Sequence, residues 1–229
     1  MRLLALAFLL AACTDAPATV PGPSDAAALA LLASVDGDAF ADAFAALDAS
    51  GYRARLVVEA DPSAGATVIV APSGDVTLED VTGALDGTPR LRDVVAQALS
   101  SDPPYLDPAA REAYRLGVVG DTTIGGVAFR IVEAVLADPA SELGVRRVRA
   151  AVTEGGLVGA IEIDRTAASM LFDEDSRVVV GLTPHAGGWV PRRVVTESRT
   201  DVPLSDPRRV RAEWTVEAVG APRGGDALE

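Results

Sequence analysis

Cys13 is the only cysteine of this 229-residue chain, and the residues before it form its most informative chemical pattern. Met1-Arg2 gives a short basic start, residues 3–10 are an unbroken apolar run, and Ala11-Ala12 follow. A basic start, a short apolar stretch and small residues before a cleavage point are typical of a secretory signal peptide. The apolar run is too short to span a bilayer, which takes about 20 residues. We therefore expect residues 1–12 to be removed on export.

The segment Leu10-Ala11-Ala12-Cys13 resembles the lipobox of bacterial lipoproteins at all four positions. This resemblance implies that the bond between Ala12 and Cys13 is cut, that Cys13 is diacylated and that the new amino terminus is acylated. Three acyl chains anchor a protein firmly, because each buried methylene adds about 0.8 kcal/mol. Residue 14 is Thr, not the Asp that retains many lipoproteins in the inner membrane, which favours the outer membrane, facing the periplasm. An ordinary signal peptide with a chance cysteine is the alternative.

Other residues with catalytic or metal-binding potential are few. His185 is the only histidine, and it lies in the turn sequence Pro184-His185-Ala186-Gly187. A Ser-His-Asp triad or a histidine-bearing zinc site would need it. Asp173-Glu174-Asp175 lacks the ligand spacing of an EF-hand, and we interpret it as a solvated hairpin tip. We expect a non-enzymatic protein without cofactor or metal. A pair of carboxylates for glycoside cleavage stays an open alternative, because only the distance between two carboxyl groups in the fold decides whether they can act together.

The charge balance bears on partners. The formal net charge is −13, from 33 acidic and 20 basic residues, which argues against electrostatic binding of nucleic acid or an anionic membrane surface. Eight arginines are predicted to lie on neighbouring strands, where they either form a positive stripe for a lipid headgroup or acidic partner or pair with carboxylates across strands. These are Arg146, Arg147, Arg149, Arg192, Arg193, Arg208, Arg209 and Arg211. The pairing is the favoured interpretation.

The start of the expected mature chain, residues 13–50, predicts a tether and then a helix. Residues 13–26 hold three prolines among small residues, which is typical of a semi-extended tether. Residues 27–50 are alanine-rich and predict a helix ended by Gly51. Phe40, Phe44 and Leu47 share one face at i, i+4 and i+7. We expect this face to pack on the core, and a sharper hypothesis makes the helix the cover of a ligand cavity.

The remaining sequence predicts mostly strands. Residues 52–59 and 66–71 predict a hairpin, residues 77–114 an inserted helical segment beginning with Leu78, Val81 and Leu85 at helical spacing, and residues 220–229 a disordered tail. Six or seven antiparallel strands are expected at 115–120, 127–136, 145–154, 157–164, 170 or 177–182, 189–198 and 208–219.

Strict alternation of apolar and polar residues in the last predicted strand indicates a sheet with one solvent-exposed face and one buried face. The apolar face of the sheet must be buried against other elements, and the predicted helices are the elements available for this. We therefore expect an α+β fold in which a curved antiparallel β-sheet, an incomplete barrel, wraps around a few helices as a single domain over residues 27–219.

This order of elements resembles the LolA/LolB-like superfamily of lipoprotein carriers, including LppX-type lipoproteins. The resemblance covers most of residues 35–219 and is carried by the order of elements, by Gly120 to Ile131 with its strand-turn-glycine-strand step, and by Gly188-Trp189-Val190-Pro191. It implies an apolar cavity that binds acyl chains of a lipid or lipoprotein, with no cofactor and no reaction. An envelope interaction or assembly module with the same fold and a solid core is the alternative.

Overall fold

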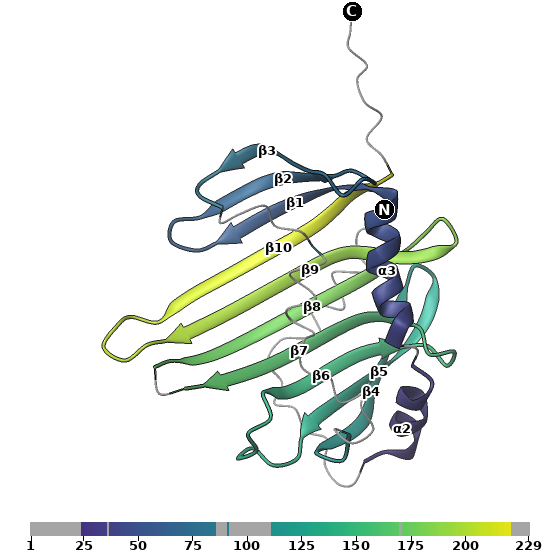
Figure 1. The fold of residues 1–229 in the computed structure, drawn as a ribbon. Coiled ribbons are helices and arrows are strands. Elements are labelled where there is room, and N and C mark those ends of the chain that lie inside the picture. The colour runs from purple at the N-terminus through teal and green to yellow at the C-terminus, as the bar shows by residue number, and fades with distance from the viewer. Residues whose placement is uncertain (1–23, 36, 86–90, 92–110, 170, 221–229) are drawn as a thin grey trace, which may run out of the picture. The chain divides into compact units, whose positions relative to one another are not determined.

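The computed structural model describes residues 24–35, 37–85, 91, 111–169 and 171–220 (Figure 1). Two helices, α2 (Ala26–Ala33) and α3 (Gly37–Ser50), precede the strands. The strands are β1 (Tyr52–Glu59), β2 (Ala64–Val70), β3 (Val76–Thr82), β4 (Tyr114–Ile124), β5 (Val127–Leu136), β6 (Val145–Val152), β7 (Val158–Ala168), β8 (Asp173–His185), β9 (Gly188–Asp201) and β10 (Arg208–Val219). Among these residues, no helix has the length and apolar character that crossing a membrane requires.

The predicted fold class is confirmed. The strands form an antiparallel sheet that does not close into a barrel, with β3 and β4 at its edges, and the described helices are few. The predicted division into signal peptide, tether, single domain and tail stays a prediction. The predicted signal peptide and most of the predicted tether and tail lie outside the described residues, in residues 1–23 and 221–229.

The chain divides into two compact units, which are described separately. Unit 1 comprises residues 1–40 and 101–166, with α2 and β4 to β7. Unit 2 comprises residues 41–100 and 167–229, with most of α3, β1 to β3 and β8 to β10.

In unit 1, helix α2 is fixed on the first half of β4. The Asp25 side chain accepts a hydrogen bond from Ala27 N (2.9 Å), which is the usual N-cap arrangement. The backbone N–H of Asp25 also donates to Leu116 O of β4 (2.8 Å). Leu31 and Leu32 are buried, so α2 contributes an apolar face to the core of this unit. That core continues across the strands in register, as in the row Leu116, Ala134, Val148 and Ile163.

Tyr114 joins two strands of unit 1 that are not neighbours. It begins β4, is buried, and donates a hydrogen bond from its hydroxyl to Val145 O of β6 (2.7 Å). Burial raises the pKa of Tyr114 above its ordinary value, and the charge of Arg146 opposes this rise. The phenol therefore stays a hydrogen-bond donor over the ordinary pH range.

In unit 2, the core centres on Trp214 of β10, which is 1% exposed. The antiparallel register places Leu56 of β1 on one side of it and Val194 of β9 on the other. Val180 of β8 continues this row, and all four side chains are buried. Alternation with period two accounts for this, because every second residue of each strand faces the same side.

Most strand predictions are confirmed, and the predicted long helix is divided. Strands 52–59, 127–136 and 208–219 have the predicted bounds. The predicted helix 27–50 is interrupted between α2 and α3. Ser34 explains the interruption, because its hydroxyl donates to Leu31 O (2.7 Å), a carbonyl that the next helical turn would otherwise use.

Two local predictions were wrong. The helical spacing of Leu78, Val81 and Leu85 predicted a helix, whereas residues 76–82 form β3 and pair with β2. The hairpin turn before them and their β-branched valines and threonines favour a strand. The predicted hairpin tip Asp173-Glu174-Asp175 instead begins β8, where these residues pair with Asp201, Thr200 and Arg199 of β9. The predicted helix over 91–99 lies, apart from Leu91, outside the described residues.

Candidate functional site

The sequence-predicted lipidation site lies outside the described part of the chain. Neither Ala12 nor Cys13 is among the described residues, so cleavage between them and acylation of Cys13 stay predictions. The predicted cover helix, in contrast, is described.

Helix α3 buries the face that the sequence indicated. Phe40, Phe44 and Leu47 are all buried along its length. Gly51 ends the helix with a φ of +69°, a left-handed conformation that glycine adopts without strain. A Cβ atom at Gly51 would lie 2.8 Å from Pro72 Cδ, so only glycine lets the chain pass this close to the end of β2. The hydrogen bond from Gly220 N to Gly51 O (2.9 Å) fixes the same point to the end of β10.

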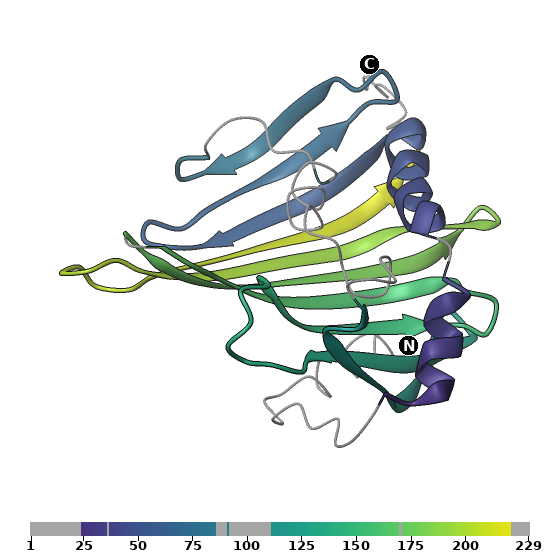
Figure 2. The same cartoon turned by 60° about the horizontal axis from the view of Figure 1, so that its bottom comes forward.

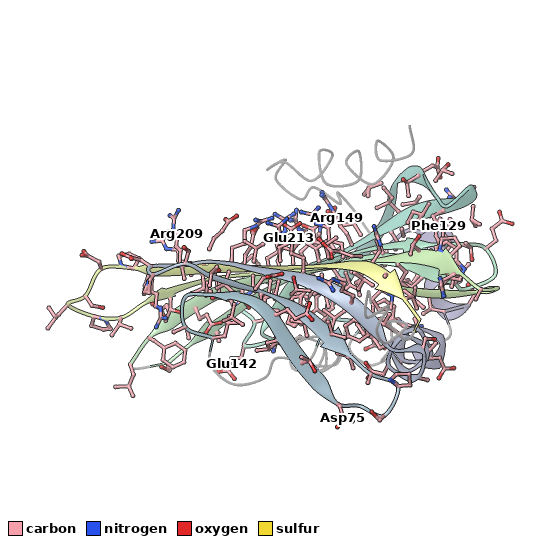
Figure 3. All side chains as sticks on the ribbon, turned by 90° about the horizontal axis from the view of Figure 1, so that it is seen from above. Asp75, Phe129, Glu142, Arg149, Arg209 and Glu213 are labelled. Carbon is pink, nitrogen blue, oxygen red and sulfur yellow. The ribbon has the colours of Figure 1, made fainter. Side chains whose placement is uncertain are left out.

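The side of the unit 2 sheet that holds Trp214 is lined by aliphatic side chains, and we call it the apolar face of unit 2. Helix α3 lies on this side of β10, and Glu213 points to the opposite side (Figure 3). Small residues alternate with larger ones, because Ala54 and Ala66 are buried next to Leu56 and Val68. The face consists of Tyr52, Ala54, Leu56, Ala66, Val68, Val180, Val194, Trp214 and Val216.

The other side of the same strands carries ion pairs. Arg211 of β10 reaches Glu59 of β1 (2.9 Å) and Glu197 of β9 (3.1 Å), its two register partners. Glu213 accepts hydrogen bonds from Arg193 (2.7 Å) and Arg211 (2.5 Å). This surface is therefore a network of opposite charges that crosses three strands.

The network shifts the ionisation of its own members. The hydrogen bond from Arg193 lowers the pKa of Glu213 below its ordinary value, although burial acts in the opposite direction, and Arg211 adds to the lowering. Burial lowers the pKa of Arg211, but the hydrogen bond and charge of Glu213 outweigh it, so the pKa is raised. Both residues stay charged around neutral pH.

Arg192 of β9 has no register partner on either neighbouring strand, β8 or β10. It is the additional residue of a bulge, because Arg193 pairs with Gly181 whereas Pro191 pairs with Leu182. Its guanidinium Nη1 donates to the carbonyl oxygen of Val216 on β10. The Arg192 side chain thus bonds to a backbone carbonyl of β10. This carbonyl lies just beyond Arg193 and Thr215, the last register pair of β9 and β10.

Unit 1 also carries ion pairs on one side of its strands, but these are shielded from solvent. Arg149 of β6 donates to Glu133 of β5 at 2.6 Å, and the Glu133 side chain is only 2% exposed. Arg147 of β6 contacts Asp164 (2.6 Å) and Glu162 (3.3 Å) of β7, and Glu162 is 6% exposed.

Beyond these pairs, the same side of unit 1 ends in a packed aromatic ring. Phe129 lies four residues before Glu133 on β5, so both side chains face the same side of the strand. Figure 3 shows Phe129 and Arg149 on one side of the strands. Phe129 is 1% exposed because its ring lies over Gly159 of β7. A Cβ atom at position 159 would come within 2.6 Å of the ring.

The eight predicted stripe arginines are divided between the two units. Arg146, Arg147 and Arg149 lie on β6 of unit 1, and the other five lie on β9 and β10 of unit 2. Four of the eight, Arg147, Arg149, Arg193 and Arg211, form ion pairs with carboxylates, which is the favoured interpretation of the sequence. His185 ends β8 next to the exposed turn at residues 186–187, away from the apolar face. In the described part of the chain, no three His, Cys, Asp or Glu residues come together as metal ligands.

Sequence reasoning missed two features. The near-complete burial of Glu133 and Glu162 was not predicted, although a single acid inside an otherwise apolar run such as Ile161-Glu162-Ile163 is a usable signal. It also missed four exposed apolar residues at turns, Leu171, Phe172, Val202 and Leu204. Their signal is the presence of large apolar residues in turns, which normally hold Gly, Pro, Asn, Asp or Ser.

No family model matches the sequence, and no curated protein matches it. Several solved structures are similar at low identity. One is a domain assigned to outer membrane lipoprotein sorting from Vibrio parahaemolyticus, with 12% identity over 77% of this chain and 86% of that chain and a TM-score of 0.32. A DUF1329 family protein from Desulfovibrio piger has 8% identity over 76% and 86% and a TM-score of 0.26. The MucA/MucB complex of Pseudomonas aeruginosa contains a chain with 13% identity over 79% and 94% and a TM-score of 0.22.

Every TM-score is below 0.5, so the proposed function rests on the residues of this chain alone.

Proposed function

We propose that this protein is an exported envelope lipoprotein, anchored in the outer membrane through Cys13, that binds an acyl chain of a lipid or lipoprotein without catalysing a reaction. The observation that carries the binding role is the apolar face of unit 2, on the side of the sheet where α3 lies. Its side chains are aliphatic apart from Tyr52 and Trp214, and aliphatic surface is what an acyl chain contacts favourably. The opposite side is occupied by ion pairs and offers no such surface.

The position of α3 on this side of the sheet makes the helix the proposed cover. Its buried residues Phe44 and Leu47 belong to unit 2, and its end is fixed at Gly51. A single helix can open locally from a sheet at lower cost than paired strands can separate, because fewer backbone hydrogen bonds break. We infer that an acyl chain enters between α3 and the sheet.

The anchor has a direct test, because the chain has one cysteine. Expression in a bacterial envelope followed by mass spectrometry of the N-terminal peptide should show a chain that starts at Cys13 with added acyl mass. Cys13→Ser should abolish this mass. An unmodified Cys13 after export would show an ordinary signal peptide instead and would remove the anchor from the proposal.

The binding role is tested with Trp214, which lies at the centre of the apolar face. The chain has two tryptophans, so Trp189→Phe leaves Trp214 as the only one. A brominated fatty acid that binds beside Trp214 should quench its fluorescence and saturate near one ligand per chain. Trp214→Phe, which keeps Trp189, is the matched control and should be quenched much less.

Native mass spectrometry with lipid extraction provides the second measurement. Phospholipid or lipoprotein that co-purifies near stoichiometrically would support the binding role and identify the headgroup. A ligand-free mass together with unquenched Trp214 would contradict it. That result would favour the second candidate function, an envelope interaction or assembly module with a solid core, because the residues of the apolar face are already buried.

A further inference from the structure

Two neighbouring turns at one end of the unit 2 sheet expose large apolar side chains. The first turn, residues 169–172, precedes β8, and the second, residues 202–207, joins β9 to β10. Leu171 is 75% exposed and Leu204 is 108% exposed, while Phe172 and Val202 are 37% and 45% exposed. We call these four residues the apolar tip.

The register of β8 and β9 places the two turns side by side. Asp173 pairs with Asp201, so Phe172 and Val202 each lie one residue beyond the same register pair. Arg208 of β10 pairs with Thr200, which brings the far side of the second turn back to the same end. Figure 1 shows the connection between β9 and β10 projecting past the ends of the strands. The apolar tip is therefore the extremity of this end of unit 2.

The second turn holds a leucine where the backbone favours glycine. Ser205 N donates to Val202 O (3.1 Å), which makes Pro203 and Leu204 the two central residues of the turn. Leu204 has a φ of +67°, the left-handed conformation that glycine or asparagine usually supplies at this position. A strained and fully exposed leucine contributes nothing to packing within the described residues, so a role outside the fold explains it best.

The first turn is closed by polar backbone contacts that leave its apolar side chains outside. Ser169 N donates to Phe172 O (2.9 Å), and the Ser169 hydroxyl oxygen accepts from the N–H groups of Leu171 and Phe172 (both 3.1 Å). These bonds pair the backbone N–H groups of Ser169, Leu171 and Phe172 within the turn. The backbone N–H groups of Leu171 and Phe172 are thus already paired, which lowers the cost of moving these residues into an apolar medium.

We propose that the apolar tip inserts into the interfacial layer of a phospholipid membrane. Four side chains on two narrow turns offer far less area than the roughly 800 Å² per partner that stable protein interfaces bury. A bilayer takes up a projecting group without a preformed complementary surface, because its interface is fluid.

Nearby charges fit this arrangement. Arg208 and Arg209 follow the second turn, are exposed, and have no carboxylate partner in the part of the chain that the structure describes. Arginines at this level contact lipid phosphates while an apolar tip lies deeper. The net charge of −13 opposes long-range attraction to anionic lipid, so apolar contact must supply most of the binding. The inference goes beyond the proposed function, because it needs neither acylation of Cys13 nor a ligand on the apolar face.

A position-specific depth measurement tests the proposal on the full chain. In a Cys13→Ser background, Leu204→Cys is labelled with an environment-sensitive fluorophore and mixed with vesicles of phosphatidylethanolamine and phosphatidylglycerol. Ala186→Cys, in the turn at the other end of the β8–β9 hairpin, is the matched control. The two positions are about 40 Å apart, because a 13-residue strand at about 3.3 Å per residue separates them.

The expected result is a blue-shifted emission at position 204 and quenching by spin-labelled phospholipid, with neither change at position 186. Equal emission at position 204 in vesicles and in buffer would overturn the proposal. Because the readout is specific to the labelled position, it does not depend on what holds the chain at the vesicle. A failed acyl-chain experiment with Trp214 therefore leaves this result unaffected.

A variant without the label supplies the second measurement. In the same Cys13→Ser background, the double variant Leu171→Ser/Leu204→Gly should lower vesicle flotation about tenfold, since burial of a single leucine side chain is worth that much or more. Arg208→Ser/Arg209→Ser should lower it less and only at low salt. Unchanged flotation of the double variant would overturn the proposal. Photo-crosslinking from position 204 to a protein instead of lipid in the envelope would also overturn it and assign the tip to a protein partner.

Discussion

The charged sides of the two units use the same residue types in different surroundings. In unit 1, Glu133 and Glu162 are 2% and 6% exposed beside Arg149 and Arg147. In unit 2, Glu59 and Glu197 are 62% and 45% exposed beside Arg211. Both sets join residues on neighbouring antiparallel strands at similar distances. The comparison therefore separates the effect of burial from the effect of geometry.

Burial changes what an ion pair does for stability. An exposed pair contributes about 0–1 kcal/mol, because water screens its charges and side-chain entropy is lost. A buried pair contributes little more overall, but removal of one partner leaves a charge without compensation, at a cost of about 3–5 kcal/mol. Unit 1 should therefore depend on the buried pairs of Glu133 and Glu162, while unit 2 should tolerate the loss of its exposed pairs to Glu59 and Glu197.

The largest effect is expected for Arg149→Met in unit 1. The variant leaves Glu133 buried without the guanidinium that now donates to it at 2.6 Å. We expect the free energy of unfolding, measured by urea denaturation, to fall by about 3–5 kcal/mol.

Two controls make this prediction specific to burial. Glu133→Leu/Arg149→Met removes both charges and should be close to neutral or stabilising. Glu59→Gln removes an exposed partner of Arg211 in unit 2 and should cost about 1 kcal/mol or less. If Arg149→Met costs no more than Glu59→Gln, the contrast between the two charged sides does not exist.

The second prediction concerns the packed end of the same side of unit 1. In Gly159→Ala, the new Cβ atom would meet the Phe129 ring at 2.6 Å and Ile124 Cδ1 at 3.0 Å. Such overpacking should lower the free energy of unfolding by about 1–3 kcal/mol, measured by urea denaturation. Gly120→Ala is the matched control on β4, because its Cβ atom would meet only Ile131 Cδ1, at 3.8 Å. Partial recovery in Gly159→Ala/Phe129→Leu would confirm the ring as the cause, and equal stability of the two alanine variants would contradict it.

Much of the sheet was predictable from sequence because its signals are local. Alternation in residues 208–219 gave the exact bounds of β10, and Gly51 gave the end of α3. β3 was missed because Leu78, Val81 and Leu85 happen to fit a helical period, and only pairing with β2 decides between helix and strand. That pairing is a contact between segments, which a single-segment pattern does not contain.

The candidate site was predictable only in part, for the same physical reason. The buried face of α3, with Phe44 and Leu47, follows from helical spacing. The burial of Glu133 depends on Arg149, which lies 16 residues away and becomes a neighbour only through the register of β5 and β6. The apolar tip likewise exists only because register brings residues 171–172 and 202–204 to the same end of the sheet.

The third prediction concerns the acid stability of the charged side of unit 2. The pKa of Glu213 is lowered in the folded protein, chiefly by the hydrogen bond from Arg193. A carboxyl group with a depressed pKa stabilises the fold at pH values above its unfolded pKa, and this contribution is lost as pH falls through the folded value. Glu213→Gln should therefore lower stability at neutral pH and show a shallower decline below about pH 4.5, measured by urea denaturation across pH. Parallel pH profiles of variant and wild type would contradict the assignment.

The smallest effect is expected at Leu204, the most exposed of all these positions. In Leu204→Gly, relief of the left-handed backbone strain gains about 1–2 kcal/mol, and the greater freedom of glycine in the unfolded chain costs about 0.4–1 kcal/mol. Because no buried contact is lost, we expect the free energy of unfolding to be unchanged or to rise by about 1 kcal/mol. Ala186→Gly, at a φ of +48°, is the matched control at the other end of β8 and should behave alike. A loss of more than 1 kcal/mol in Leu204→Gly alone would mean that the leucine packs within the protein in solution. Unchanged stability with reduced vesicle flotation would instead separate the membrane contact of Leu204 from any role in folding.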